Sequence, residues 1–263
     1  MSENLDYINY SCYFTVFREG EQFVSYNALS MVISGEMELN DGVHRKVFRS
    51  GDVYLVQKNQ LLKFLKKPCE EEGFKSLSIR FDDTLLKQMS TEEDFVLREK
   101  KKTPAFINLS EVSYLKYFME SLLQYQDLLE NKSPELALVK QKEALLLLFG
   151  HDVTLKNILY DSYDPYKINL EEFMLKNYHF NVKLDRFAYL TGRSLATFKR
   201  DFEKIFGIAP GKWLLQKRLQ EARYLLEKGK KASDIYLDLG FEDLSHFSFT
   251  FKKQFGLSPS MIS

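Results

Sequence analysis

The feature that most constrains the fold of this chain is an internal repeat in its C-terminal part. Residues between positions 185 and 210 recur, as identical or similar types, 49 residues later. So many matches at one offset indicate a duplicated supersecondary unit. The matched pairs are Asp185/Asp234, Phe187/Tyr236, Leu190/Leu239, Leu195/Leu244, Phe198/Phe247, Phe202/Phe251, Lys204/Lys253, Phe206/Phe255, Gly207/Gly256, Ile208/Leu257 and Pro210/Pro259.

Each repeated unit predicts two short helices joined by a tight turn. In the first unit we expect helices over Leu184–Leu190 and Leu195–Phe206, with Ser194 as the N-cap and Gly207 at the C-cap position. A turn of three or four residues that contains glycine, between two short helices, is typical of a helix-turn-helix motif. The second unit repeats this order with a helix over 233–239, a turn over 240–243 and a helix over 244–255.

The second helix of each unit is amphipathic. We expect one face to be buried, through Leu195, Phe198, Phe202 and Ile205 in the first unit and Leu244, Phe247, Phe251 and Phe255 in the second. The opposite face carries small, hydroxylated and basic residues, which are the types that contact base edges and phosphates. A merely solvated face would look the same, but the paired glycine turns favour DNA binding. The candidate DNA-contacting residues are Ser194, Ala196, Thr197, Lys199, Arg200, Lys204, Ser245, His246, Ser248, Phe249, Lys252 and Lys253.

The distribution of charge supports that interpretation. The whole chain is neutral, with 37 basic and 37 acidic residues. From Pro165 to Ser263, however, 17 Lys and Arg residues stand against 11 Asp and Glu residues, a net charge of +6, which leaves −6 for residues 1–164. Such an asymmetry suggests that one half of the chain meets a polyanion, although two unrelated surface compositions would give it too.

A longer helix is predicted between the two units, over Pro210–Leu226. A rigid connecting helix fixes the distance between the units. Two recognition helices ~34 Å apart can enter successive major grooves on one face of the DNA.

The C-terminal 95 or so residues resemble the AraC/XylS family of bacterial transcription regulators. The resemblance rests on Gly240-Phe241-Glu-Asp-Leu-Ser245-His246-Phe247, on Phe251-Lys252-Lys253 and Gly256-Leu-Ser258-Pro259, and on Trp213-Leu214, Arg218-Leu219, Ala222 and Leu225-Leu226 in the connecting helix. It implies that Ala196, Lys199 and Arg200 in the first unit face bases or phosphates. It implies the same of Ser245, His246, Ser248 and Phe249 in the second. The chain departs from the family at Phe249, where many members carry Arg or Lys.

Phe249 has two open interpretations. It lies two residues after the expected core residue Phe247, about 200° round the helix, so we expect it to point outward. It either packs on a neighbouring helix or on the N-terminal domain, or it contacts a thymine methyl group in the major groove.

The N-terminal half predicts β-structure over residues 7–81, as seven or eight short strands at near-even spacing. Asn40-Asp41-Gly42 predicts a type I′ hairpin. The resemblance implies a cupin-like β-barrel here, followed by dimerising helices. The expected fold class is therefore α+β, with an N-terminal cupin-like β-barrel and two helices, then an all-α domain of two helix-turn-helix units. The expected domains are a regulatory barrel (1–109), a helical dimerisation element (110–149), a linker (150–167) and a DNA-binding domain (168–263) whose units span 184–206 and 233–255.

Two helices are expected over residues 110–149, the first capped near Ser110 and the second beginning at Pro134. Their apolar faces either pack on the β-domain or form a self-association surface, and we expect some of both. The residues assigned to dimerisation are Leu115, Phe118, Met119, Leu122, Leu123 and Leu129.

Other classes of function find little support. The longest apolar run, Ala144–Phe149, is far shorter than the ~20 residues needed to span a bilayer, and the N-terminus lacks the apolar core of a signal peptide. We expect a cytoplasmic protein with no metal, no cofactor and no catalytic activity, in which Cys12 and Cys69 are buried or half-buried thiols and His44 is a solvated surface residue. The expected partners are double-stranded DNA, a second copy of the chain, and a small molecule or protein that acts on the N-terminal domain. The alternative is a small-molecule-binding or protein-interaction β-barrel whose helical tail does not read DNA.

Overall fold

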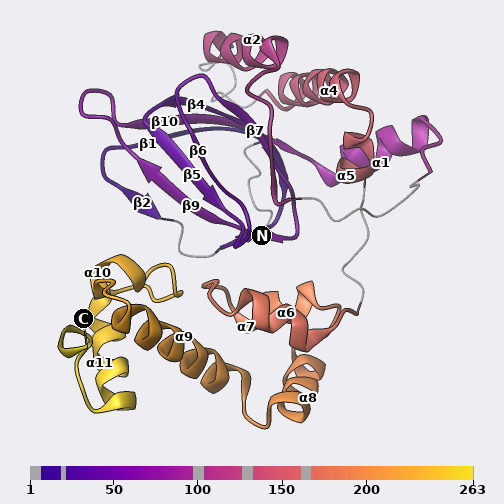
Figure 1. Ribbon diagram of the computed structural model, residues 1–263. Coiled ribbons are helices and arrows are strands. Elements are labelled where there is room, and N and C mark those ends of the chain that lie inside the picture. The colour runs from indigo at the N-terminus through magenta and orange to yellow at the C-terminus, as the bar shows by residue number, and fades with distance from the viewer. Residues whose placement is uncertain (1–6, 19–21, 97–103, 126–132, 161–166, 263) are drawn as a thin grey trace. The chain divides into compact units, whose positions relative to one another are not determined.

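The computed structural model describes the chain except for residues 1–6, 19–21, 97–103, 126–132, 161–166 and 263. The chain divides into two compact units (Figure 1). The first comprises residues 1–19 and 24–163, and the second comprises residues 20–23 and 164–263. No helix in the described ranges is long and apolar enough to cross a membrane.

The first unit is built on two antiparallel sheets, as the strand pattern predicts. One has the order β1-β10-β4-β7-β11 and the other β2-β9-β5-β6, while β3 and β8 form a short pair. The strands are β1 (Ile8–Tyr13), β2 (Phe17–Arg18), β3 (Phe23–Val24), β4 (Asn27–Ser34), β5 (Glu36–Asn40), β6 (Arg45–Phe48), β7 (Val53–Val56), β8 (Gln60–Leu61), β9 (Lys63–Lys67), β10 (Phe74–Phe81) and β11 (Phe106–Asn108).

The five-stranded sheet is buried on both faces. Alternate residues of β4 contribute to two different cores: Leu29 and Met31 to one, Val32 to the other. The core that includes Val32 draws its apolar side chains from both sheets, among them Leu39 and Phe48 of the four-stranded sheet. The core that includes Leu29 also contains residues of the helices that cover the sheet. Burial on both faces explains why β4 carries apolar residues on both of its faces and does not alternate strictly with polar ones.

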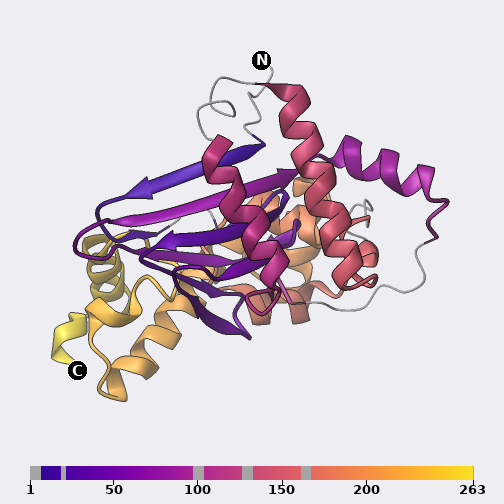
Figure 2. The same ribbon diagram turned by 90° about the horizontal axis from the view of Figure 1, so that it is seen from above.

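The helices of the first unit cover one side of the sheets (Figures 1 and 2). They are α1 (Asp83–Glu92), α2 (Ser113–Leu122), a 3₁₀ turn η1 (Leu123–Tyr125), α4 (Pro134–His151) and α5 (Leu155–Leu159). The start of α4 at Pro134 is confirmed, and the Ser133 hydroxyl accepts the backbone N–H of Leu136 at 3.3 Å. The cap expected near Ser110 was wrong. Helix α2 has Val112 as its N-cap without a side-chain bond, because the Ser110 hydroxyl bonds Asn108 Oδ1 at 2.7 Å instead.

The residues assigned to dimerisation are core residues of the first unit. Leu115, Phe118, Met119 and Leu122 are buried against the sheet and α4, and Leu123 packs against the same core. They are therefore not available to a second copy of the chain. The sequence could not show this, because an apolar helix stripe looks the same whether it faces a sheet or a partner. Leu129 lies outside the described residues.

Two local predictions need correction. The β5–β6 connection is a four-residue loop, since Asn40 pairs with Arg45, and only Gly42 in it has a positive φ (+88°), so the expected type I′ hairpin was wrong. The Asp41 carboxylate accepts the backbone N–H groups of Val43 and His44 at 2.9 and 2.6 Å, which stabilises this longer loop. The expected linker also begins too early: α4 ends only at His151, and α5 packs Leu155 and Leu159 into the core.

In the second compact unit, the regular elements after residue 167 are all helices, as expected. Its elements are α6 (Leu170–Asn177), α7 (Leu184–Leu190), α8 (Leu195–Phe206), α9 (Pro210–Glu227), α10 (Ala232–Ile235), α11 (Leu244–Phe255) and the 3₁₀ turn η2 (Pro259–Met261). The bounds predicted for α7, α8 and α11 are confirmed, whereas α10 is shorter than the predicted Ser233–Leu239. Helix α9 runs between the pair α7–α8 and the pair α10–α11 (Figure 1).

The two faces of α4 differ enough for a stability test. Leu148 is fully buried, whereas Leu146, two residues away, is 61% exposed. We expect Leu148→Ala to lower the free energy of unfolding by about 2–5 kcal/mol, through lost burial and a new cavity, and Leu146→Ala to change it by no more than ~0.5 kcal/mol. Urea titrations at low protein concentration measure both values. Similar losses for the two variants would contradict this placement of the helix.

Candidate nucleic-acid interface

Helix α8 is capped at both ends by its own residues, and one of its faces is polar and exposed. The Ser194 hydroxyl accepts the N–H of Thr197 at 3.3 Å, and the helix ends at Gly207 with φ +72°. Phe198 and Phe202 are fully buried, which fixes the rotation of the helix. The predicted outward residues follow from that rotation: Ala196, Lys199, Arg200 and Lys204 are exposed, and Thr197 is half-buried.

Helix α11 has the same construction. The Asp243 carboxylate accepts the N–H of His246 at 2.6 Å, and the helix ends at Gly256 with φ +78°. Phe247 and Phe251 are fully buried. On the other side Ser245, His246, Phe249, Lys252 and Lys253 are exposed and Ser248 is half-buried.

The buried stripes are narrower than the sequence suggests. Leu195 and Leu244 are each 39% exposed and Ile205 is 44% exposed, so the expectation that these three are buried was wrong. The two phenylalanines of each helix, spaced four apart, are enough to anchor it. Leu195 and Leu244 directly follow the caps, where the helix end projects beyond the core.

The two helix-turn-helix units differ in the turn between their two helices. Gly192 and Gly240 both have positive φ and both lie in the turn after the first helix of their unit, but they are 48 residues apart, not 49. Helices α7 and α10 also begin 48 residues apart, at Leu184 and Ala232. The second turn therefore contains one extra residue before the cap, and the buried ring of Phe241 belongs to this turn. One upstream match at an offset of 49 needs correction, because buried Phe187 corresponds to buried Ile235 rather than to half-buried Tyr236. Leu190 and Leu239 are both buried, so that match stands.

A half-buried arginine ties the connecting helix to the segment before the first helix-turn-helix unit and to the turn of the second. Arg218 of α9 donates to three backbone carbonyl oxygens, those of Tyr178 (2.8 Å), Phe180 (2.8 Å) and Gly240 (3.0 Å). Burial lowers the pKa of Arg218 to about 10, so the guanidinium remains charged at neutral pH. One side chain thereby holds the segment before α7 and the turn before α11 to the same point of α9.

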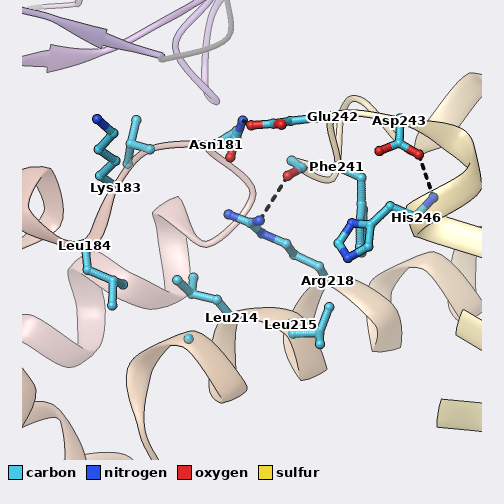
Figure 3. Close-up of a pocket in the computed structure, with 13 residues that line it drawn as sticks. Asn181, Lys183, Leu184, Leu214, Leu215, Arg218, Phe241, Glu242, Asp243 and His246 are labelled. Atoms are coloured by element: carbon cyan, nitrogen blue, oxygen red, sulfur yellow. Dashed lines mark hydrogen bonds between the residues drawn. The ribbon is translucent and has the colours of Figure 1, made fainter. Parts of the chain in front are cut away.

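Figure 3 shows Arg218 in a cleft of about 440 Å³ between these elements, with Leu214 and Leu215 of α9 beside it and Glu242, Asp243 and His246 on the side of the second turn. At the rim, Asn181 donates its amide N–H to the Glu242 carboxylate at 3.0 Å. Sequence reasoning placed Arg218 only within a family pattern and missed this role. The available signal was a cation at a stripe position of α9, among Leu214, Leu215 and Ala222.

A second arginine braces α8 against its own turn. Arg193 lies 3.2 Å from the Asp201 carboxylate and donates to the carbonyl oxygens of Ile168 (3.0 Å) and Thr191 (2.7 Å). The hydrogen bond from Arg193 holds the pKa of Asp201 below its usual value. Arg200 lies 3.5 Å from the same carboxylate but keeps 75% of its side chain exposed. Its guanidinium is therefore available to an external acceptor.

The N-terminal unit carries the histidine and the two cysteines that the sequence singled out as candidate reactive residues, His44, Cys12 and Cys69. Among the residues that the structure describes, no group of three or more His, Cys, Asp or Glu side chains lies together there as metal ligands would. His44 pairs with Asp41 at 3.1 Å on the surface. The thiols of Cys12 and Cys69 are exposed, so the expectation that they are buried or half-buried was wrong. Cys69 lies in an isolated bridge with Gly73, and a hydrogen bond with Ser34 at 3.1 Å lowers the pKa of its thiol.

Family models match parts of both compact units, the N-terminal one and the C-terminal one. Residues 187–262 match a model described as a helix-turn-helix domain, and residues 27–156 match a model described as the ExsA N-terminal regulatory domain. Together these matches cover most of the described chain.

Among individual proteins, some are similar over about a third of this chain and another is similar over most of it. The virulence regulon transcriptional activator VirF of Yersinia enterocolitica is 38% identical over 92 residues, which are 35% of this chain and 34% of VirF. The match thus spans about a third of that relative's length. The HTH-type transcriptional regulator ExsA of Pseudomonas aeruginosa is 24% identical over 234 residues, 88% of this chain and 83% of ExsA. Among solved structures, an apo variant of ToxT from Vibrio cholerae covers 97% of this chain and 95% of its own, at 14% identity and a TM-score of 0.45.

The contact between Arg218 and the second turn can be tested at Gly240. A Cβ atom there would lie 2.9 Å from the carbonyl oxygen of His179 and 2.9 Å from Arg218 Cζ, which three hydrogen bonds hold in place. Gly229 is a matched control, because its φ (+79°) is close to that of Gly240 (+81°) but its Cβ would meet nothing. Both alanine variants incur about 1–2 kcal/mol of left-handed strain. We expect Gly240→Ala to lose at least ~1 kcal/mol more than Gly229→Ala in thermal unfolding, as a clash with fixed neighbours requires. Equal losses would show that Arg218 is not held rigidly.

Proposed function

The chain belongs to the AraC/XylS family of transcription regulators, and on that premise we propose that it binds a specific DNA site by placing α8 and α11 in successive major grooves. In this proposal the C-terminal unit reads the DNA, and the N-terminal unit supplies dimerisation and regulation. We place the protein in the cytoplasm, where its DNA would be.

One observation carries the proposal: two capped helices with exposed polar faces are joined by a connecting helix, and a half-buried cation of that helix holds both the segment before α7 and the turn before α11. Each helix is anchored by two buried phenylalanines, so the face opposite the core has a fixed direction. Arg218 removes the freedom of the second turn relative to the segment before α7. A fixed spacing is what recognition of two grooves separated by one helical turn of DNA requires.

The side chains divide into two chemical roles. Arg200 has a largely exposed guanidinium and can donate two parallel hydrogen bonds to a guanine edge. Ala196, Thr197, Ser245, His246 and Ser248 are small or polar residues near the helix starts and fit base edges or sugar oxygens. Lys199, Lys204, Lys252 and Lys253 carry exposed ammonium groups suited to phosphates. Ser194 acts first as the cap of α8.

We further propose that the protein self-associates through the outer face of α4. Val139 (58% exposed) and Leu146 (61% exposed) lie on one stripe of this helix with Lys142, Glu143 and Leu147, and these five residues line a shallow hollow. Their spacing follows the helical repeat, so they form a continuous surface, which we call the α4 stripe. Because the stripe carries one cation and one anion, two copies related by a two-fold axis can pair opposite charges across an apolar centre. A small molecule or a protein that acts on the N-terminal unit would then control this assembly or the reading of DNA.

The DNA roles predict different behaviour for two cations. Arg200→Ala should cost about 1–3 kcal/mol on a selected site and much less on scrambled DNA, because it removes a base contact. Lys252→Ala should weaken both duplexes alike and reduce the slope of log K against log salt by about one phosphate. Fluorescence anisotropy of the full chain over a salt series measures both effects.

The control for these two variants is Lys87→Ala, which removes an exposed cation from α1 in the N-terminal unit. It should leave the affinity and the salt slope unchanged. Equal losses of Arg200→Ala on selected and scrambled DNA would refute its role in base reading, and a wild type that selects no sequence at low salt would refute DNA recognition itself.

The α4 stripe predicts a dimer that a single charge disrupts. Leu146→Glu should shift sedimentation toward the monomer, because two carboxylates would meet at the two-fold axis in an apolar surface. Val43→Glu is the control, since Val43 is 84% exposed in the β5–β6 loop, away from α4. A wild type that remains monomeric at tens of micromolar, where an interface with a Kd of about a micromolar would be filled, excludes this interface.

A further inference from the structure

Phe249 is an exposed aromatic residue on an otherwise polar helix face. Its side chain is 67% exposed, and of the phenylalanines in the described ranges only Phe14 is also exposed. Phe247 and Phe251, on the opposite side of α11, are fully buried and take part in ring contacts. In the described part of the chain the ring of Phe249 contacts no other aromatic ring, so it does not belong to the core of its own unit. The ring is therefore accessible to an external partner.

The position of Phe249 equals that of Arg200 in the other unit. Each residue is the sixth after its N-cap, Ser194 in α8 and Asp243 in α11, and both helices run for 12 residues to a glycine C-cap. Both helices are anchored by phenylalanines at the fourth and eighth positions after the cap. Position six therefore points in the same direction from each helix relative to its own core. Where α8 offers a guanidinium, α11 offers a phenyl ring.

The surroundings of Phe249 identify the partner by charge. On the helix surface its neighbours one turn earlier are Ser245 and His246, and one turn later Lys252 and Lys253, and all four are exposed. Two ammonium groups beside the ring favour a polyanion over an apolar protein surface. Within DNA, the apolar group that the major groove presents to a side chain is the 5-methyl group of thymine.

We propose that Phe249 packs against the 5-methyl group of a thymine, so that the second unit selects T·A at the position where the first unit selects a guanine through Arg200. The inference rests on the proposed function and adds the identity of one base to it. It also gives the binding site a direction, because the two units present different chemistry at equivalent positions. The protein would therefore bind its site in one orientation.

The test removes single methyl groups from the DNA. The full-length protein first selects its site from random duplexes. Each thymine of that site is then replaced, one at a time, by deoxyuridine, which lacks only the 5-methyl group. The replacements are measured with the wild type, Phe249→Ala, Phe249→Leu, and the control Tyr224→Ala, whose side chain is 54% exposed on α9.

We expect one thymine at which deoxyuridine weakens wild-type binding by about fourfold, the effect of one buried methyl group. Phe249→Ala should weaken binding to the thymine site to a similar degree and become insensitive to that replacement. Phe249→Leu should keep part of the sensitivity, and Tyr224→Ala should keep all of it. The melting temperature of Phe249→Ala should stay at the wild-type value, because the ring is outside the core.

Several results would overturn the inference while leaving DNA binding intact. One is a selected site at which no thymine methyl matters, and another is a sensitivity that persists in Phe249→Ala. A third is a lower melting temperature with unchanged base preferences, which would make the residue structural. If Phe249→Ala kept every base preference but lost transcriptional activity, the ring would contact a protein instead. Failure of the wild type to select any site would instead refute the proposed function.

Discussion

The arrangement of the C-terminal unit depends on one half-buried guanidinium. Arg218 lies in the apolar stripe of α9, where a cation is costly unless its donors are satisfied. Three backbone carbonyls accept hydrogen bonds from it, and two of these carbonyls, those of Tyr178 and Gly240, are 62 residues apart in the chain. The cost of partly burying the charge is thus offset only when the segment before α7 and the turn before α11 are both in place. Arg218 thereby fixes the position of these two segments relative to α9.

The same frame then carries two different reading surfaces. Paired phenylalanines and a side-chain cap set the direction of α8 and of α11, so equivalent positions point the same way. The outward residues are free to differ because they carry none of the packing. In the first helix-turn-helix unit they include the guanidinium of Arg200, which lies beside the carboxylate that Arg193 holds. In the second they include the exposed ring of Phe249. The extra residue in the second turn adds the buried ring of Phe241 at the place where Arg218 reaches Gly240.

The N-terminal unit likewise combines a packed and an exposed apolar surface. Its five-stranded sheet is covered on one face by the second sheet and on the other by helices, and this packing buries the leucine and phenylalanine stripe of α2. Helix α4 is apolar on more than one side, so it can bury Leu148 in the core and still expose Leu146. The leucines and phenylalanine of α2 that the sequence assigned to dimerisation therefore pack in the core, while α4 keeps apolar side chains exposed.

The sequence by itself determined the duplicated units, the bounds of α7, α8 and α11, the caps of α8 and the outward faces, because these follow from local periodicity and from residues within one helical turn. It also indicated the family, through motifs that lie within single helices and turns. Only the tertiary structure decided the role of Arg218, the exposure of Leu195 and Ile205, the extra residue in the second turn, and which apolar helix face remains open. Each of these depends on contacts between segments far apart in the chain, and an apolar or charged residue has the same local pattern whether its partner is a sheet, a carbonyl or solvent.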